Sequence, residues 1–255
     1  MTGYDDRGWV AFAPDPRTLA WAKAALTAAR EAIAAPENAH WLRHGGTWFA
    51  GVNVLPNAPD GSLRGIPLAG PALDFLADHE AMPAAWDRAQ ISVVYPGYPQ
   101  PGPGETPANA TYRRKRDAAH VDGLLPVGPD RRRVLGETHG FVLGIPLTQA
   151  SAEASPMVVW EGSHQIIGAA LAQVLRPHPP DTWTEIDVTD AYHAARRRCF
   201  DTCRRRIVHV PVGGAYVVHR HALHGVAPWA EGASADPEGR IIAYFRPEIA
   251  PERWL

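Results

Sequence analysis

Short apolar runs recur along most of the chain, and glycine and proline residues separate them. Runs of this kind that are rich in β-branched residues and end at turn-forming residues predict β-strands. The 25 prolines and 23 glycines fall between the runs, as expected for many strands joined by turns. We therefore predict a mainly β protein with strands near 48–55, 90–95, 141–147, 157–160, 207–211, 215–219 and 240–247.

A smaller part of the chain has helical patterning. The alanine-rich segment 18–35 predicts a helix, with Asp15 as its N-terminal cap and Pro16 at its first position. Pro36 follows the segment and ends the helix. Ser163 is a candidate cap for a helix from about Gln165 to Leu175. A short helix is expected within 70–85, and an arginine-rich helix opened by Thr189 is expected from Asp190 to about Arg206.

No internal repeat or linker divides the chain. A length of 255 residues is enough for one sizeable core, and all-β sandwiches or barrels of this size are often one domain. We predict a single domain over 1–255, with a helical N-terminal part at about 15–90 and a barrel core at about 90–250. The proline- and glycine-rich stretch from Tyr98 to Pro107 is expected to be a long loop at a binding site or lid.

Composition narrows the classes of partner. Hydrophobic residues make up 45% of the chain and charged residues 20%, which is typical of soluble globular proteins, and the net charge of −2 does not favour nucleic acid or membrane partners. No apolar run is long enough to span a bilayer, and the first ten residues lack the apolar region of a signal peptide. Two cysteines cannot build a disulfide scaffold, so we expect a reducing, cytoplasmic location.

Candidate chemistry begins with His120 and Asp122. On an extended segment, side chains two residues apart lean to the same side, so an imidazole and a carboxylate can reach one cation. A second imidazole would complete a 2-His-1-carboxylate triad, which leaves open positions on Fe(II). A His-x-Asp sequence alone is also typical of a surface or turn pair, so a third ligand has to support the metal-site interpretation.

Three histidines compete for the third position: His219, His221 and His224. His219 and His221 would share one face of a strand, whereas His224 would lie at its exit. Arg240 comes 16 residues after His224, at the start of the next predicted strand. A guanidinium there can pair with the distal carboxylate of a diacid that chelates the metal.

These residues resemble the motifs of the phytanoyl-CoA dioxygenase family of iron(II)- and 2-oxoglutarate-dependent oxygenases. The resemblance extends from about Gln90 to Pro247. Two departures are present: Glu161 replaces a common proline, and the interval between His224 and Arg240 is longer than usual, which keeps Arg246 as a competitor for the carboxylate. The matching segments are His120–Asp122, Glu161–His164, Gly213–Gly214, His219–Gly225 and Arg240.

The resemblance implies a double-stranded β-helix, a jelly-roll or cupin-like barrel with flanking helices. It implies that His120, Asp122 and His224 bind Fe(II) and that Arg240 binds the distal carboxylate of the co-substrate 2-oxoglutarate. The reaction would use O2 to hydroxylate a small molecule, with release of succinate and CO2. Relatives that halogenate lack the carboxylate ligand, so Asp122 favours hydroxylation.

Two other classes of function remain open from the residues alone. One is a cupin-like hydrolase or isomerase that uses the same ligands around zinc or manganese. The other is a non-catalytic barrel that binds a small ligand or a protein partner.

The arginine clusters suggest that the small-molecule substrate is anionic. Arg113, Arg114 and Arg116 precede His120, and further arginines lie in the segment 190–206. Either group can attract an anion to the predicted site. Other candidate cavity residues are Thr47, Trp48, Asn53, Ser163, His164 and Trp229.

Overall fold

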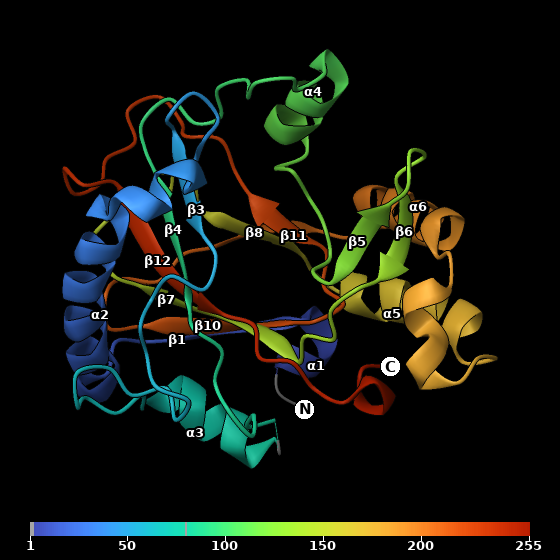
Figure 1. Ribbon diagram of the computed structural model, residues 1–255, viewed down its shortest axis with the longest axis horizontal. Coiled ribbons are helices and arrows are strands. Elements are labelled where there is room, and N and C mark those ends of the chain that lie inside the picture. The colour runs from blue at the N-terminus through green and yellow to red at the C-terminus, as the bar shows by residue number, and fades with distance from the viewer. Residues whose placement is uncertain (1–2, 80) are drawn as a thin grey trace.

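Two antiparallel β-sheets pack face to face, and helices cover their outer surfaces (Figure 1). The computed structural model describes residues 3–79 and 81–255. The larger sheet has the order β1-β10-β7-β12-β4-β3-β2, and the smaller one has the order β11-β8-β9. In the order of the larger sheet, its strands are Trp9–Phe12, Ala215–His219, Phe141–Pro146, Arg240–Phe245, Gln90–Val94, Trp48–Gly51 and Leu42–Arg43. The smaller sheet consists of His224–Val226, Met157–Trp160 and Arg205–Val208.

The central strands are apolar on both faces because both faces are buried. In β12, Ile241, Ala243 and Phe245 point into the core under the helices, whereas Ile242 and Tyr244 point toward the smaller sheet. The same alternation holds in β7 and β10. A strand buried on both sides has no polar face, so its sequence reads as a continuous apolar run.

Helices close the two outer faces. The helices α2 (Pro16–Ala34) and α3 (Pro71–Asp78) pack on the larger sheet, and α5 (Ser163–Leu175) and α6 (Thr189–Thr202) pack behind the smaller one. The short helix α1 (Gly3–Arg7) precedes β1. The remaining elements are α4 (Pro107–Lys115), the hairpin β5 (Leu124–Val127) and β6 (Arg132–Leu135), and the 3-10 helices Pro36–Trp41, Pro180–Glu185 and Pro251–Arg253. No helix in the described ranges is long and apolar enough to cross a membrane.

The predicted mainly β architecture with flanking helices is confirmed. The predicted N-terminus of α2 is also confirmed, because the Asp15 side chain accepts a hydrogen bond from the Arg17 backbone N–H and Pro16 opens the helix. Strands were predicted within a few residues of the observed β4, β7, β8, β10 and β12.

Two predictions about local structure were wrong. Ser163 does not cap α5: Gly162 occupies the cap position, and the Ser163 hydroxyl accepts a hydrogen bond from the Leu223 backbone N–H at 2.8 Å. The arginine-rich helix ends at Thr202 rather than near Arg206, and Arg205 and Arg206 belong to β9. Their guanidinium groups pair with Asp117 and Glu161, which fixes them on the smaller sheet.

Candidate metal centre

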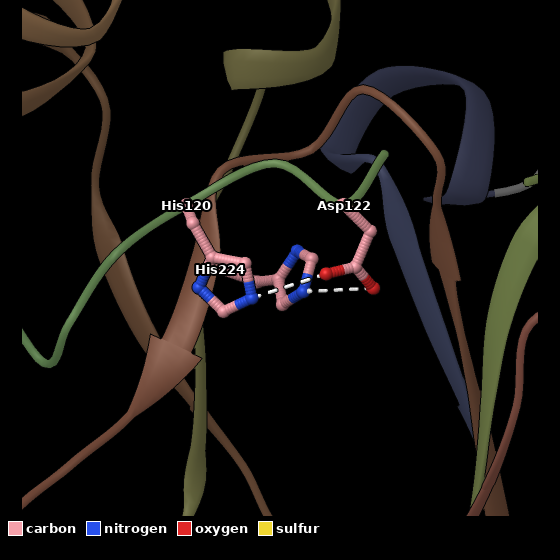
Figure 2. A group of neighbouring side chains, drawn as sticks. All are labelled: His120, Asp122 and His224. Carbon is pink, nitrogen blue, oxygen red and sulfur yellow. Dashed lines mark ion pairs between the residues drawn. The ribbon is translucent and has the colours of Figure 1, made fainter. Parts of the chain in front are cut away.

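Three side chains predicted as ligands meet at one point (Figure 2). Among the described residues, His120, Asp122 and His224 form the one cluster of three histidine, cysteine or acidic side chains whose ligand atoms all lie within 4.8 Å of one another. The Nε2 atom of His120 lies 3.0 Å from Asp122 Oδ1, and that of His224 lies 3.6 Å from Asp122 Oδ2. Two imidazoles and one carboxylate are therefore arranged as a metal with open positions requires.

Backbone pairing brings the two histidines together although they are about a hundred residues apart in the chain. The His120 N–H donates to the His224 carbonyl at 2.8 Å, and the His224 N–H donates to the His120 carbonyl at 3.0 Å. His224 begins β11, so the His120 segment extends the smaller sheet by one residue pair. Gly123, with φ 83°, then turns the chain immediately after Asp122.

Hydrogen bonds orient both imidazole rings. His120 Nδ1 lies 3.0 Å from the Ala118 carbonyl oxygen, and His224 Nδ1 lies 2.9 Å from that of Ala222. A carbonyl accepts only from N–H, so each Nδ1 carries a proton and each Nε2 faces the cluster, where a metal would bind the neutral ring through the Nε2 lone pair. Metal-binding histidines are commonly fixed in this way by the second ring nitrogen.

Asp122 is held as a carboxylate. Burial alone would raise its pKa, but the neighbouring Arg246 guanidinium and the two histidines lower the pKa well below its usual range. Arg246 Nε donates to Asp122 Oδ2 at 2.7 Å, and Arg246 Nη1 donates to Gln90 Oε1 at 2.6 Å. For His120, desolvation disfavours the charged ring, yet the hydrogen bond and charge of Asp122 outweigh it and raise the pKa. A cation bound here would replace that proton.

Gly225 is required for this pairing of strands. A Cβ atom at Gly225 would clash with the Asp117 carbonyl oxygen, which accepts a hydrogen bond from the Val226 N–H at 3.0 Å. We expect Gly225→Ala to separate β11 from the 117–120 segment, to reduce the free energy of unfolding by about 1–3 kcal/mol and to weaken metal binding at least tenfold. Chemical denaturation and a metal titration measure the two effects.

Gly128→Ala is the matched control for this substitution. Gly128 lies in the turn of the β5–β6 hairpin with φ 66°, and a Cβ atom there would meet nothing within 4 Å. The substitution should lower the free energy of unfolding by about 1–2 kcal/mol, because alanine disfavours the left-handed backbone at this position. It should leave metal affinity unchanged. Equal metal affinities of Gly225→Ala and the wild type would contradict the role given to the strand pairing.

A cavity of about 1180 Å³ opens onto the three side chains. Trp48, Asn53 and Arg113 line it, as predicted. Arg114 and Arg116 do not line it: Arg114 is exposed, and Arg116 stacks on Phe200. The predicted cavity residues Thr47, Ser163, His164 and Trp229 also lie outside it. Thr47 and Ser163 are buried, where their hydroxyl groups bond to the backbone.

Arg240 lies at the opposite end of β12 from Arg246. The two side chains share the face of the strand that points toward the smaller sheet. Arg240 is 6% exposed, its Nη1 has no hydrogen-bond partner among the described residues, and it lines a separate cavity of about 20 Å³. Arg246 lines the large cavity with the three candidate ligands. Tyr216 lines the small cavity, Tyr244 lines the large one, and a 2.9 Å hydrogen bond joins their hydroxyl groups, so this pair lies between the two arginines.

His219 and His221, the other candidates for the third ligand, lie outside the cluster. The His219 ring is 4.9 Å from that of His164 and 5.3 Å from that of His221, measured between centroids. The His221 ring packs against Trp254 at 4.5 Å. His221 is buried and His219 is partly buried, and neither lines the large cavity.

No sequence pattern indicated the residues that hold Arg246. Gln90 opens β4, and Asp87 accepts from the Arg246 backbone N–H at 3.1 Å. Neither residue belongs to a spacing pattern, because both act on a residue about 160 positions away. Only the pairing of β4 with β12 places them beside Asp122.

No protein-family model matches the chain, and no curated protein matches it. Solved structures with a similar chain arrangement include AviO1 from Streptomyces viridochromogenes Tue57, at 15% identity over 97% of this chain and 93% of that chain, with a TM-score of 0.49. The non-heme alpha ketoglutarate dependent epimerase SnoN from nogalamycin biosynthesis is 15% identical over 96% and 80%, with a TM-score of 0.46. EctD from S. alaskensis, solved with 2-oxoglutarate and 5-hydroxyectoine, is 12% identical over 96% and 74%, with a TM-score of 0.42. These values assign no reaction to this chain, and the resemblance to the phytanoyl-CoA dioxygenase family stays a prediction.

Proposed function

We propose that this protein is a non-haem Fe(II)- and 2-oxoglutarate-dependent dioxygenase that hydroxylates a small molecule. The observation that carries the proposal is the convergence of His120, Asp122 and His224 on one point at the edge of a large cavity. Both histidines present Nε2, and the cavity leaves room on the open side for a co-substrate, O2 and a substrate. When bound, iron and 2-oxoglutarate would supply the oxidising chemistry, with succinate and CO2 as by-products.

The donor set fits Fe(II). Neutral imidazole and carboxylate are ligands that divalent iron accepts, and two histidines with one carboxylate occupy only three positions around the metal. The fixed rings and the Arg246 contact to Asp122 hold the ligands in place before any metal arrives. Asp122 also occupies a position that halide-transferring enzymes leave open, and this supports hydroxylation.

We further propose that the two sheets are the two halves of a double-stranded β-helix. The order β4-β12-β7-β10 in one sheet faces His120, β11, β8 and β9 in the other. These eight positions are divided equally between the two sheets, as in a jelly roll. The N-terminal helices share a continuous core with the larger sheet, which supports one domain over the whole chain.

Arg240 is our candidate for the distal carboxylate of 2-oxoglutarate. Its guanidinium is buried with an unpartnered Nη1, and a buried donor without an acceptor indicates a missing partner. The carboxylate would approach along the inner face of β12, past the Tyr216–Tyr244 pair. Arg246 remains the competitor, because it lines the cavity that contains the metal ligands.

The decisive experiment adds Fe(II) and 2-oxoglutarate without oxygen and follows the visible charge-transfer band of the chelate. The wild type should show the band. Arg240→Ala should weaken 2-oxoglutarate binding on the order of a hundredfold or more, since breaking a buried ion pair costs about 3–5 kcal/mol. Arg240→Lys should restore part of the affinity, because lysine keeps the charge but lacks the planar fork.

Arg246→Ala serves as the comparison. A normal titration in Arg240→Ala beside a weakened one in Arg246→Ala would move the carboxylate contact to Arg246 and leave the rest of the proposal intact. Absence of the band in a wild-type protein that demonstrably binds iron would refute the oxygenase assignment.

A further inference from the structure

One wall of the large cavity carries positive charge without a matching carboxylate. Arg133 and Arg196 both line this wall, and neither makes an ion pair within the described ranges. Of the other arginines that line this cavity, Arg113 pairs with Glu105 at 3.1 Å and Arg246 with Asp122 at 2.7 Å, whereas Arg43 stacks on Trp41 and Arg131 is exposed. The charge on the first wall is therefore available to a ligand.

The two unpaired guanidinium groups are close enough to repel one another. Burial lowers the pKa of Arg133, and the charges of Arg131 and Arg196 lower it further; only two tyrosines, Tyr192 and Tyr112, oppose them. Like charges held together at a half-buried position are unfavourable unless an anion joins them. Arg133 Nη1 donates to the Leu124 carbonyl at 3.0 Å, which fixes the side chain in place.

Arg196 lies between two aromatic rings. Its Cζ is 5.1 Å from the centroid of Tyr112 and 5.4 Å from that of Tyr192. Its Nε is buried and has no hydrogen-bond partner among the described residues. The rings therefore hold the guanidinium by cation–π contacts and leave a desolvated donor without an acceptor.

The same tyrosines connect this wall to the candidate metal centre. The Tyr112 hydroxyl donates to the Ala119 carbonyl at 2.7 Å, and the Tyr192 hydroxyl is hydrogen-bonded to the Val121 backbone. Ala119 and Val121 flank His120 in the sequence, so the wall abuts the metal ligands. Figure 1 shows α6 and the β5–β6 hairpin on one side of β11, with β12 on the other.

We propose that Arg133 and Arg196, framed by Tyr112 and Tyr192, bind a carboxylate or phosphate group of the substrate. This inference rests on the proposed oxygenase function and defines its substrate class. A guanidinium fork satisfies two oxygens of such a group at once. Bound there, the anionic group anchors the substrate so that its neighbouring C–H bonds lie over the metal centre. The co-substrate carboxylate is assigned to Arg240, on the opposite side of β11.

The test uses three probes that share a ring and differ in charge: phenyl phosphate, phenylacetate and neutral 2-phenylethanol. Each is titrated calorimetrically, without oxygen, into the full chain loaded with Fe(II) and 2-oxoglutarate. At least one anionic probe should bind tenfold or more tightly than 2-phenylethanol, and the stronger of the two identifies the oxyanion. Arg133→Gln and Arg196→Gln should each weaken that probe at least tenfold, with Arg196→Lys in between.

Arg198→Gln is the matched control. Arg198 lies on the same helix as Arg196 but is exposed and outside the cavity, so its replacement should leave probe binding unchanged. Thermal unfolding of every variant checks the fold. If Arg196→Gln fails to fold, Arg133→Gln and Arg196→Lys carry the test.

Three results would overturn the inference. The first is equal affinity for neutral and anionic probes, and the second is wild-type affinity in both glutamine variants. The third is a loss of 2-oxoglutarate affinity as large as the loss of probe affinity, which would make the pair a co-substrate site. Failure of the oxygenase assignment is distinguishable: the charge-transfer band would be missing, while probe binding by the metal-free chain would still depend on Arg196.

Discussion

Replacing His120 or His224 with alanine, or Asp122 with asparagine, is expected to lower Fe(II) affinity at least a hundredfold and to abolish metal-dependent turnover. Each change removes one of three ligand atoms, and two ligands do not retain a catalytic metal. Asparagine suits position 122 because its neutral amide is a far weaker metal ligand than a carboxylate, yet its oxygen can still accept a hydrogen bond from the Arg246 guanidinium. Anaerobic titration with Fe(II) measures the affinity, and denaturation curves show that the variants are folded.

His221→Ala is the control for the triad. His221 is only three residues from His224, yet its ring packs on Trp254 away from the cluster. The variant should lose stability through the cavity that it creates, but it should keep metal affinity near that of the wild type. Loss of the metal in His221→Ala, together with its retention in His224→Ala, would show that the ligand assignment is wrong.

The second large effect expected is loss of stability in mild acid, caused by buried histidines that are not metal ligands. Burial is the main reason that the pKa of His219 is lowered to about 2 and that of His221 to about 3; the charges of Arg220 and His164 add to it for both residues. The unfolded chain has a histidine pKa near 6.5 and takes up protons first, so stability is complete at neutral pH and falls as the pH drops below about 6.5. At pH 4.5, about two units below the pKa of an unfolded histidine, protonation of these two residues in the unfolded chain lowers the free energy of unfolding by about 5 kcal/mol in total.

Urea denaturation of the metal-free protein at pH 7.0 and 4.5 measures this loss. Asp122 remains ionised at pH 4.5 because its pKa lies well below the usual range, so protonation of this carboxylate does not cause the loss. The double variant His219→Gln, His221→Gln should be less stable at pH 7.0 but should lose far less on acidification. His40→Gln, at an exposed position, should behave as the wild type does. An unchanged pH dependence in the double variant would refute this account.

The sequence predicted the fold best where local and global preferences coincide. The strands β4, β7 and β12 are buried on both faces, and their largely apolar runs were recognisable without further information. By contrast, α4 is short and polar and follows a proline-rich loop. Its Thr106 cap and Pro107 were therefore assigned to the loop, although both are helix-start signals.

The errors concern residues whose partners are distant in the chain. Ser163 has the composition of a helix cap, but its hydroxyl is used by Leu223, 60 residues away. Arg205 was expected in a helix, yet Asp117 holds it on a strand. For the site, sequence spacing selected three side chains that the structure brings together. It could not place Arg246 against Asp122, nor Arg196 between two tyrosines, because those contacts depend on tertiary packing.

Because the backbones of His120 and His224 are paired, a bound metal would also stabilise this edge of the smaller sheet against local opening. Among the described residues, three backbone hydrogen bonds attach the 117–122 segment to β11: two between His120 and His224, and one from the Val226 N–H to the Asp117 carbonyl. So few bonds offer little resistance to local opening. A metal ligated by His120, Asp122 and His224 would crosslink chain segments about a hundred residues apart, much as a reversible disulfide does. Metal content would then set how often this edge of the sheet opens, and the amide protons of His120 and His224 would exchange with solvent far more slowly in the loaded protein than in the metal-free one.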